Sequence, residues 1–267
     1  MQLCTIKLYK TLKVISALTI ALALAAPLPG YAGTPAAPPP GSNLPAPAPV
    51  NQRIFGNTLY DTAVKISQSG WTTAATVVLA TGRSFPDALA GTVLAHKVNG
   101  PLLLTESQQL LPQVREELNR LHPQKVYILG GTAALGPEVE TALKAQGYAT
   151  QRLWDMDQYG TAAKIAAAVT TSAPAAYLVT GENFPDALSI SSYAAAQNIP
   201  ILMTRPDQVP PETLQAIAAL GIREVTVIGG PGAIKDTVPK QLAALPNPVQ
   251  VTARLWGQTQ YDTNLAV

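Results

Sequence analysis

An internal duplication with a constant offset of 99 residues constrains this chain more than any other feature. Self-similarity at a fixed period is the signature of a repeated structural unit, so the fold must be one that can be placed twice in tandem. A third copy begins at Arg254 and ends with the chain at Val267, so by the repeat length we expect most of a third unit to be missing. The matching blocks are Arg53-Ile54-Phe55 with Arg152-Leu153-Trp154, Phe85 to Leu89 with Phe184 to Leu188, Pro101 to Thr105 with Pro200 to Thr204, and Ile128 to Gly131 with Val227 to Gly230.

Helical and strand patterns alternate within each copy. The predicted strands are short, continuous apolar runs, as expected when helices cover both faces of a parallel sheet. The sequence therefore predicts an α/β fold of tandem repeats, each a mostly parallel sheet flanked by helices, with Rossmann-like or Toprim-like layering. In the first copy we expect helices over 58–68, 86–97, 112–121 and 137–146, and strands over 76–81, 102–105 and 125–129.

The N-terminal part has the pattern of an export signal. Lys7, Lys10 and Lys13 precede an apolar run, and a small-residue cleavage pattern ends at Ala32. We expect residues 1–32 to be a signal peptide that is removed, because the apolar run is shorter than the roughly 20 residues of a membrane span. Its removal lowers the net charge from +2 to −1, with 15 basic against 16 acidic residues. A broad basic face for nucleic acid is therefore not expected.

The remaining boundaries follow from composition and the duplication. Residues 33–52 are rich in Pro and Ala and predict an extended linker. Repeat 1 is expected over 53–151, repeat 2 over 152–253, and the start of a truncated third repeat over 254–267.

Two aspartates stand in equivalent positions directly after predicted strands. Asp87 and Asp186 belong to the Phe-Pro-Asp-Ala-Leu blocks, where Pro suits the first turn of a helix and a carboxylate suits its positive end. Helix initiation alone explains them, but ligand contact remains open because open α/β sheets bind ligands at the carboxyl ends of their strands. Gly130-Gly131 and Gly229-Gly230 are interpreted as tight turns.

An Arg and a Tyr seven residues apart occur in all three copies. The pairs are Arg53 with Tyr60, Arg152 with Tyr159, and Arg254 with Tyr261, and an aromatic residue follows each Arg by two positions. Guanidinium and aromatic groups suit an anionic or glycan polymer, and they equally suit a clamp between units. Arg83 is a further candidate contact, although its counterpart is Glu182.

Nothing in the sequence predicts catalysis, a cofactor or a metal site. The single cysteine, Cys4, lies in the expected signal peptide, and His96 and His122 face Ala195 and Gly221 in the second copy. No His/Glu metal cluster or nucleophile-elbow motif is present.

Taken together, these blocks resemble the cell wall-binding repeat 2 family, the tandem modules of clostridial cell-wall proteins and of Bacillus autolysins and their modifier proteins. The resemblance covers about residues 53–267. It implies α/β modules, usually three around a pseudo-threefold axis, that hold an exported protein non-covalently to anionic cell-wall polymer.

We therefore expect a secreted, non-catalytic module at the cell wall or cell surface that binds an anionic secondary polymer or peptidoglycan. Expected polymer contacts are Arg53, Tyr60, Arg83, Asp87, Arg152, Tyr159, Asp186, Arg254 and Tyr261. After signal cleavage no membrane contact is expected, and repeats or copies of the chain could pack together. Two alternatives stay open: part of a peptidoglycan hydrolase of the N-acetylmuramoyl-L-alanine amidase type, or of its modifier, whose catalytic domain is missing, and a structural surface-layer subunit.

Overall fold

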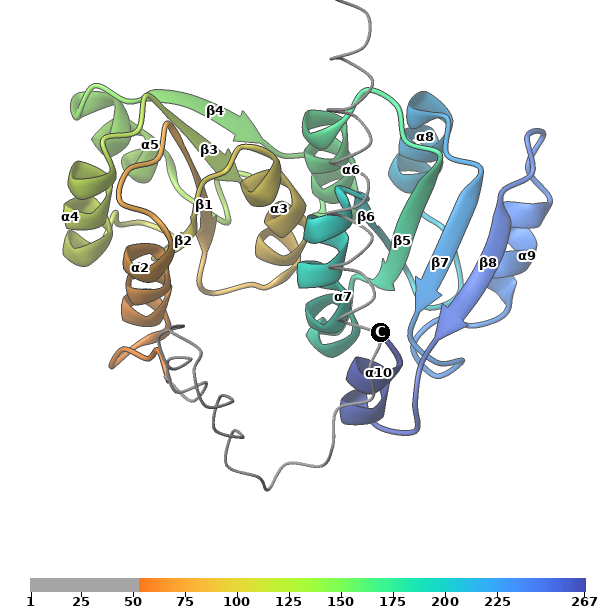
Figure 1. Cartoon of the computed structure of the whole chain (residues 1–267). Helices are drawn as coiled ribbons and strands as arrows, with labels where there is room; N and C mark the ends of the chain where they lie inside the picture. Colours follow the sequence, from red (N-terminus) through yellow and green to blue (C-terminus); the bar gives the residue numbers. More distant parts are fainter. Residues whose placement is uncertain (1–52) are drawn as a thin grey trace, which may run out of the picture. The chain divides into compact units, whose positions relative to one another are not determined.

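Two four-stranded parallel sheets, one from each repeat, form the framework of the protein (Figure 1). The structure is a computed structural model that describes residues 53–267. The signal-peptide and linker predictions lie outside the described residues. The strand orders are β2-β1-β3-β4 and β6-β5-β7-β8, and every pairing is parallel, which confirms the predicted α/β tandem repeat.

Helices and strands alternate in the same order in both repeats. Repeat 1 contains α2 (Leu59–Gly70), β1 (Thr76–Thr81), α3 (Pro86–Lys97), β2 (Leu102–Thr105), α4 (Pro112–Leu121), β3 (Lys125–Leu129), α5 (Pro137–Ala145) and β4 (Ala149–Leu153). Repeat 2 contains α6 (Gln158–Val169), β5 (Ala175–Thr180), α7 (Phe184–Gln197), β6 (Ile201–Thr204), α8 (Pro211–Leu220), β7 (Glu224–Ile228), α9 (Thr237–Ala243) and β8 (Gln250–Leu255). The short helix α10 (Gln260–Ala266) begins the third copy.

The repeat boundaries drawn from sequence pass through a strand in each case. Arg152 and Arg254, the first residues of the second and third copies, lie inside β4 and β8. Each of these strands completes the sheet that precedes it, through pairing with β3 or β7. They are edge strands with alternating exposed and half-buried residues, so the search for continuous apolar runs did not predict them.

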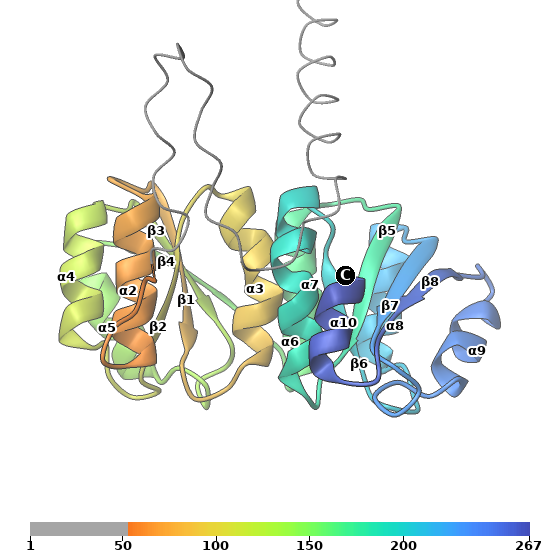
Figure 2. The same ribbon diagram turned by 60° about the horizontal axis from the view of Figure 1, so that its bottom comes forward.

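A shared apolar core joins the two repeats. Helix α3 of repeat 1 contacts both α6 and α7 of repeat 2, and Figure 2 shows α3 lying beside α7 between the two sheets. Leu94, Ile165 and Ile190 are fully or almost fully buried in this core, at 0, 1 and 0% exposure. Because it contains residues of both sheets and of all three helices, the repeats form one continuous packing unit.

Equivalent residues of the two repeats also meet at the edge of this core. The rings of Phe85 and Phe184 contact edge to face at 5.7 Å between centroids. Thr92 donates a hydrogen bond to the carbonyl of Ser191, its counterpart 99 residues later. Contacts between equivalent positions indicate that a local symmetry axis passes between α3 and α7. The threefold arrangement itself stays a prediction.

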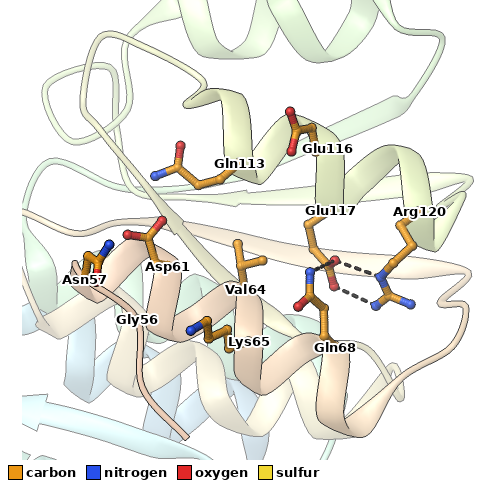
Figure 3. A pocket seen from close by; sticks show the side chains of 10 residues that line it. All are labelled: Gly56, Asn57, Asp61, Val64, Lys65, Gln68, Gln113, Glu116, Glu117 and Arg120. Carbon is orange, nitrogen blue, oxygen red and sulfur yellow. Dashed lines mark hydrogen bonds and ion pairs between the residues drawn. The ribbon is translucent and has the colours of Figure 1, made fainter.

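Repeat 1 contains a buried charged network on its outer side, between α2 and α4 (Figure 3). The Glu117 carboxylate accepts hydrogen bonds from the Arg120 guanidinium, at 2.7 and 2.8 Å, and from the Ser67 hydroxyl. Burial raises the pKa of Glu117, but the hydrogen bonds from Arg120 and Ser67 outweigh it and hold the pKa below its usual value. Arg120 also donates to the carbonyls of Trp71 and Thr72, so the network fixes the start of the α2–β1 loop.

Within residues 53–267, no helix is long and apolar enough to cross a bilayer.

Replacing Glu117 with Ala is expected to lower the free energy of unfolding by about 2–4 kcal/mol, because it removes the partner of Arg120 and leaves a cavity. Urea denaturation at pH 7 measures this change. The neighbouring exposed Glu116→Ala is the matched control and should change stability by less than about 0.5 kcal/mol. Equal effects of the two substitutions would show that the network contributes nothing.

Candidate functional site

Two equivalent pockets lie at the carboxyl ends of the central strands, one in each repeat. The first has a volume of about 290 Å³ and the second about 530 Å³. Each is formed by the start of α3 or α7, the loop after β3 or β7, and the segment that leads into the next repeat. This is the position at which open parallel sheets bind ligands.

A glycine pair forms the loop beside each pocket, and its second member, Gly131 or Gly230, lines the pocket. Gly130 and Gly229 have φ values of +90° and +119°, a conformation that other residues rarely adopt, so the prediction of tight turns is consistent with the backbone. A side chain at Gly229 would come within 2.6 Å of the Asp186 carboxylate. Glycine is therefore required both by the turn and by the close approach of the aspartate.

An arginine holds each of these loops through hydrogen bonds to two of its carbonyl groups, and we call it the clamp arginine. The Arg152 guanidinium donates to the carbonyls of Gly130 and Leu135 at 2.9 and 2.8 Å and pairs with Glu140. Arg254 donates in the same way to the carbonyls of Gly229 and Ile234. The Arg152 and Arg254 side chains are only 11 and 17% exposed, and each holds a loop of the sheet to which its own strand belongs, so a clamp between units stays a prediction. Polymer contact by these two residues stays a prediction.

A tryptophan forms one wall of each pocket. Trp154 and Trp256 lie against Gly131 and Gly230, where a Cβ would come within 3.2 and 2.7 Å of the indole ring. Even so, the two side chains remain 48 and 46% exposed. Each pocket therefore presents an accessible, positioned aromatic surface.

The two aspartates enter the pockets beside these rings. Asp87 and Asp186 lie in the first turns of α3 and α7, as helix initiation predicted. Burial raises the pKa of Asp87 to about 6, and it also raises the pKa of Asp186. Burial is the sole cause of both shifts, so in the described part of the chain no cation or hydrogen-bond donor compensates either carboxylate.

Each pocket is completed by the following copy. Gln158 and Thr161 of α6 line the first pocket, and Gln260 and Thr263 of α10 line the second. The fourteen residues of the third copy thus supply the same wall to repeat 2 that α6 supplies to repeat 1. The pockets belong to the junctions between copies.

Tyr60 and Arg83 meet at a different place, around Glu106. The Tyr60 hydroxyl and the Arg83 guanidinium both donate to the Glu106 carboxylate, at 2.7 and 2.8 Å. Burial and the hydrogen bond to Glu106 raise the pKa of Tyr60, and the bonds from Arg83 and Tyr60 lower that of Glu106.

In repeat 2 the charges of this group are exchanged. Glu182 replaces Arg83 and Arg205 replaces Glu106, and Arg205 lies over the Tyr159 ring at 4.7 Å. The exchange leaves one acidic and one basic residue at these two positions, but among the described residues the ion pair of Arg205 is with Asp157, at 3.7 Å, and not with Glu182.

The remaining predicted contacts differ widely in exposure. Tyr159 is 2% exposed and lies in the shared core, whereas its counterpart Tyr261 on α10 is 74% exposed. Arg53 is exposed and its guanidinium lies 5.4 Å from the Phe55 ring. The structure therefore brings only Asp87 and Asp186, of the nine predicted residues, into the duplicated pockets.

The sequence analysis did not predict Trp154 and Trp256 as site residues. The signal was present, because an aromatic residue follows each repeated Arg by two positions. In a strand such residues share a face, but at the end of β4 the chain turns and places Trp154 over the glycine loop while Arg152 points beneath it. Among residues 53–267 no cluster of His, Cys, Asp or Glu is suited to a metal ion.

Tandem parallel α/β units with a ligand-sized pocket at each junction define a repeated binding module. The model of Cell wall binding domain 2 (CWB2) matches residues 53–140 and 152–239. The chain belongs to this family and is a cell-wall-binding module, as the sequence resemblance predicted.

Relatives and a solved structure agree with this assignment. The chain is 33% identical to N-acetylmuramoyl-L-alanine amidase LytC of Bacillus subtilis (strain 168) over 79% of its own length and 41% of that protein. It is 32% identical to the amidase enhancer of the same organism, over 80% of the chain and 28% of that protein. Cwp6 from Clostridium difficile superposes with a TM-score of 0.73 at 27% identity, over 79% of this chain and 34% of that one. The chain thus spans less than half the length of each.

Asp87→Asn is expected to stabilise the protein above pH 6 by about 1–2 kcal/mol and to change stability little near pH 4. The pKa of Asp87 in the folded protein, about 6, lies above its usual value of 3.8, so ionisation of Asp87 opposes folding increasingly as pH rises between these values. Urea unfolding of both proteins at pH 4 and pH 7 measures the difference. A stability gain that is the same at both pH values would refute the unpaired, buried carboxylate.

Proposed function

We propose that the duplicated junction pockets hold the chain non-covalently to the sugar units of an anionic wall polymer. The observation that carries this proposal is that each pocket combines an uncompensated, half-buried carboxylate with a half-exposed tryptophan. Sugar hydroxyl groups donate hydrogen bonds to carboxylates, and the apolar face of a sugar ring packs on an indole. An occupied pocket would supply the donors that Asp87 and Asp186 lack.

Two pockets on one rigid unit suit a polymer better than a small ligand. A chain molecule that fills both gains avidity, because the second contact forms within the same complex. The anionic groups of the polymer would lie outside the pockets, where Arg53 and Arg83 are exposed, because the aspartates repel negative charge within them.

Residues 53–267 are proposed to break no bond. Carboxylates and aromatic rings line the pockets, with no histidine, cysteine or lysine: Asp87, Asp155, Asp157 and Trp154 in the first, and Asp186, Phe184 and Trp256 in the second. The LytC relative is an amidase by name, yet the chain spans 41% of it, so its activity is not carried over to this chain. The module would act outside the cell, at the wall.

Replacing both Trp154 and Trp256 with Ala is expected to reduce co-sedimentation with purified cell walls at least tenfold, since each stacking surface contributes about 1 kcal/mol or more. The single replacements should give intermediate affinities. The matched control is Tyr193→Ala, which removes a side chain of similar exposure, 48%, outside the pockets. Wall binding that survives the double replacement in a folded protein would exclude the pockets as the polymer site.

Dye release from labelled peptidoglycan tests the second part of the proposal. The isolated chain should release nothing above the buffer rate under conditions in which it binds walls. Release that persists after purification to homogeneity would make the chain a hydrolase.

A further inference from the structure

A groove between α2 and α4 exists on the outer side of repeat 1, away from the junction pockets (Figure 3). Its volume is about 440 Å³, within the range of pockets that hold small ligands. α2 contributes Asp61, Lys65 and Gln68, and α4 contributes Gln113 and Glu116 on the facing side. The Glu117–Arg120 network closes one end.

Repeat 2 shows that the fold does not require this polar lining. Counterparts of Ser67, Gln68, Glu117 and Arg120 are all alanines, namely Ala166, Ala167, Ala216 and Ala219. Ala166 and Ala216 are buried, in the apolar core that α6 and α8 share. Because a buried ion pair is commonly no more stabilising than apolar packing of similar shape, stability alone does not account for the network in repeat 1.

The groove presents both signs of charge on opposing helices. Lys65 on α2 and Glu116 on α4 form no ion pair with any residue in the described part of the chain, although the Lys65 ammonium lies 5.5 Å from the Phe55 ring. Amide side chains, Asn57, Gln68 and Gln113, line the space around them.

These groups match a ligand that carries an ammonium group, a carboxylate and amide bonds between them. Glu116 and Asp61 suit the ammonium group, Lys65 suits the carboxylate, and side-chain amides form paired hydrogen bonds with peptide amides. An anionic polymer fits poorly, since three carboxylates, Asp61, Glu116 and Glu117, face two cations, Lys65 and Arg120.

We propose that the α2–α4 groove of repeat 1 is a second binding site, for a short zwitterionic peptide of the kind that forms the peptide stems of peptidoglycan. The site is separate from the junction pockets and does not depend on them. Repeat 2, with its alanine-rich interface, lacks the groups that the site needs.

The test is an NMR titration of the whole chain without its signal peptide, with a synthetic peptidoglycan stem pentapeptide that contains one diamino acid. Backbone amides of Gln68, Gln113 and Glu116 should shift on saturation, and those of Ala167, Glu212 and Gln215 at the equivalent places of repeat 2 should not. Lys65→Gln and Glu116→Gln should each weaken the affinity about tenfold, because each removes a charge-assisted hydrogen bond. The matched control Lys164→Gln, at the position of Lys65 in repeat 2, should leave the affinity unchanged.

Two results would overturn this site. One is the absence of shifts in the groove at millimolar peptide, and the other is equal shifts on addition of an uncharged wall disaccharide, which would make the groove a sugar site. The Trp154→Ala, Trp256→Ala protein separates the two proposals. It should bind the pentapeptide with unchanged affinity, while its co-sedimentation with walls falls at least tenfold.

Discussion

The binding architecture depends on the burial of α3 between the two repeats. An open parallel sheet needs a helix layer on each face, and α3, together with α6 and α7, covers the inner faces of both sheets in one continuous core. This packing fixes the start of α6 beside the loop after β3, so that residues of both repeats line the first pocket. Without it, Asp87 would still begin its helix, but the wall formed by Gln158 and Thr161 would be absent. The duplicated site is therefore a consequence of tandem packing, and a single isolated repeat would present only part of it.

Loop geometry determines what the pockets contain. In each repeat one arginine satisfies two loop carbonyls from below, and the tryptophan two residues later covers the same loop from above. The glycine pair makes both contacts possible, because a Cβ at Gly130, Gly229 or Gly230 would collide with the aspartate or the indole, and one at Gly131 would press on the indole at 3.2 Å. This arrangement leaves the two aspartates half-buried with no compensating charge, which disfavours their ionised form. Uncompensated polar groups of this kind are uncommon away from binding sites, and their recurrence in both copies argues that the ligand, not the fold, uses them.

Most of the fold was predictable from sequence because the repeated unit is built from strong, local patterns. The buried strands β1, β2 and β3 are short apolar runs, and Pro at the first turns of α3, α4 and α5 marks where those helices begin. Strands β4 and β8 were not predicted, since neither contains the continuous apolar run that marks the buried strands. The site was predicted less well. The repeat period shows where a residue lies along the chain. Whether the Arg152 side chain contacts the Gly130 loop or enters the pocket depends on the turn after β4, which sequence spacing does not define. Tyr159 and Tyr261 occupy the same position in successive copies, yet one is 2% and the other 74% exposed, because exposure depends on which unit packs beside the helix.

Comparison of the two repeats separates the polar groups that both copies contain from those that occur in only one copy. Both copies retain the pocket aspartate, the glycine pair, the clamp arginine and the tryptophan, although their identities elsewhere have diverged. Around Tyr60 and Tyr159 the charges are exchanged and the contacts differ: Arg83 pairs with Glu106, whereas Arg205 pairs with Asp157 and lies over the Tyr159 ring. The Glu117 network follows neither pattern: all of its polar members are replaced together by alanine in repeat 2, and the helices there pack through apolar contacts. A group that changes as a unit, and that the fold can do without, is best explained by a role confined to repeat 1. The shared pockets and the groove of repeat 1 therefore differ in chemistry and in number, which agrees with the two different ligands proposed for them.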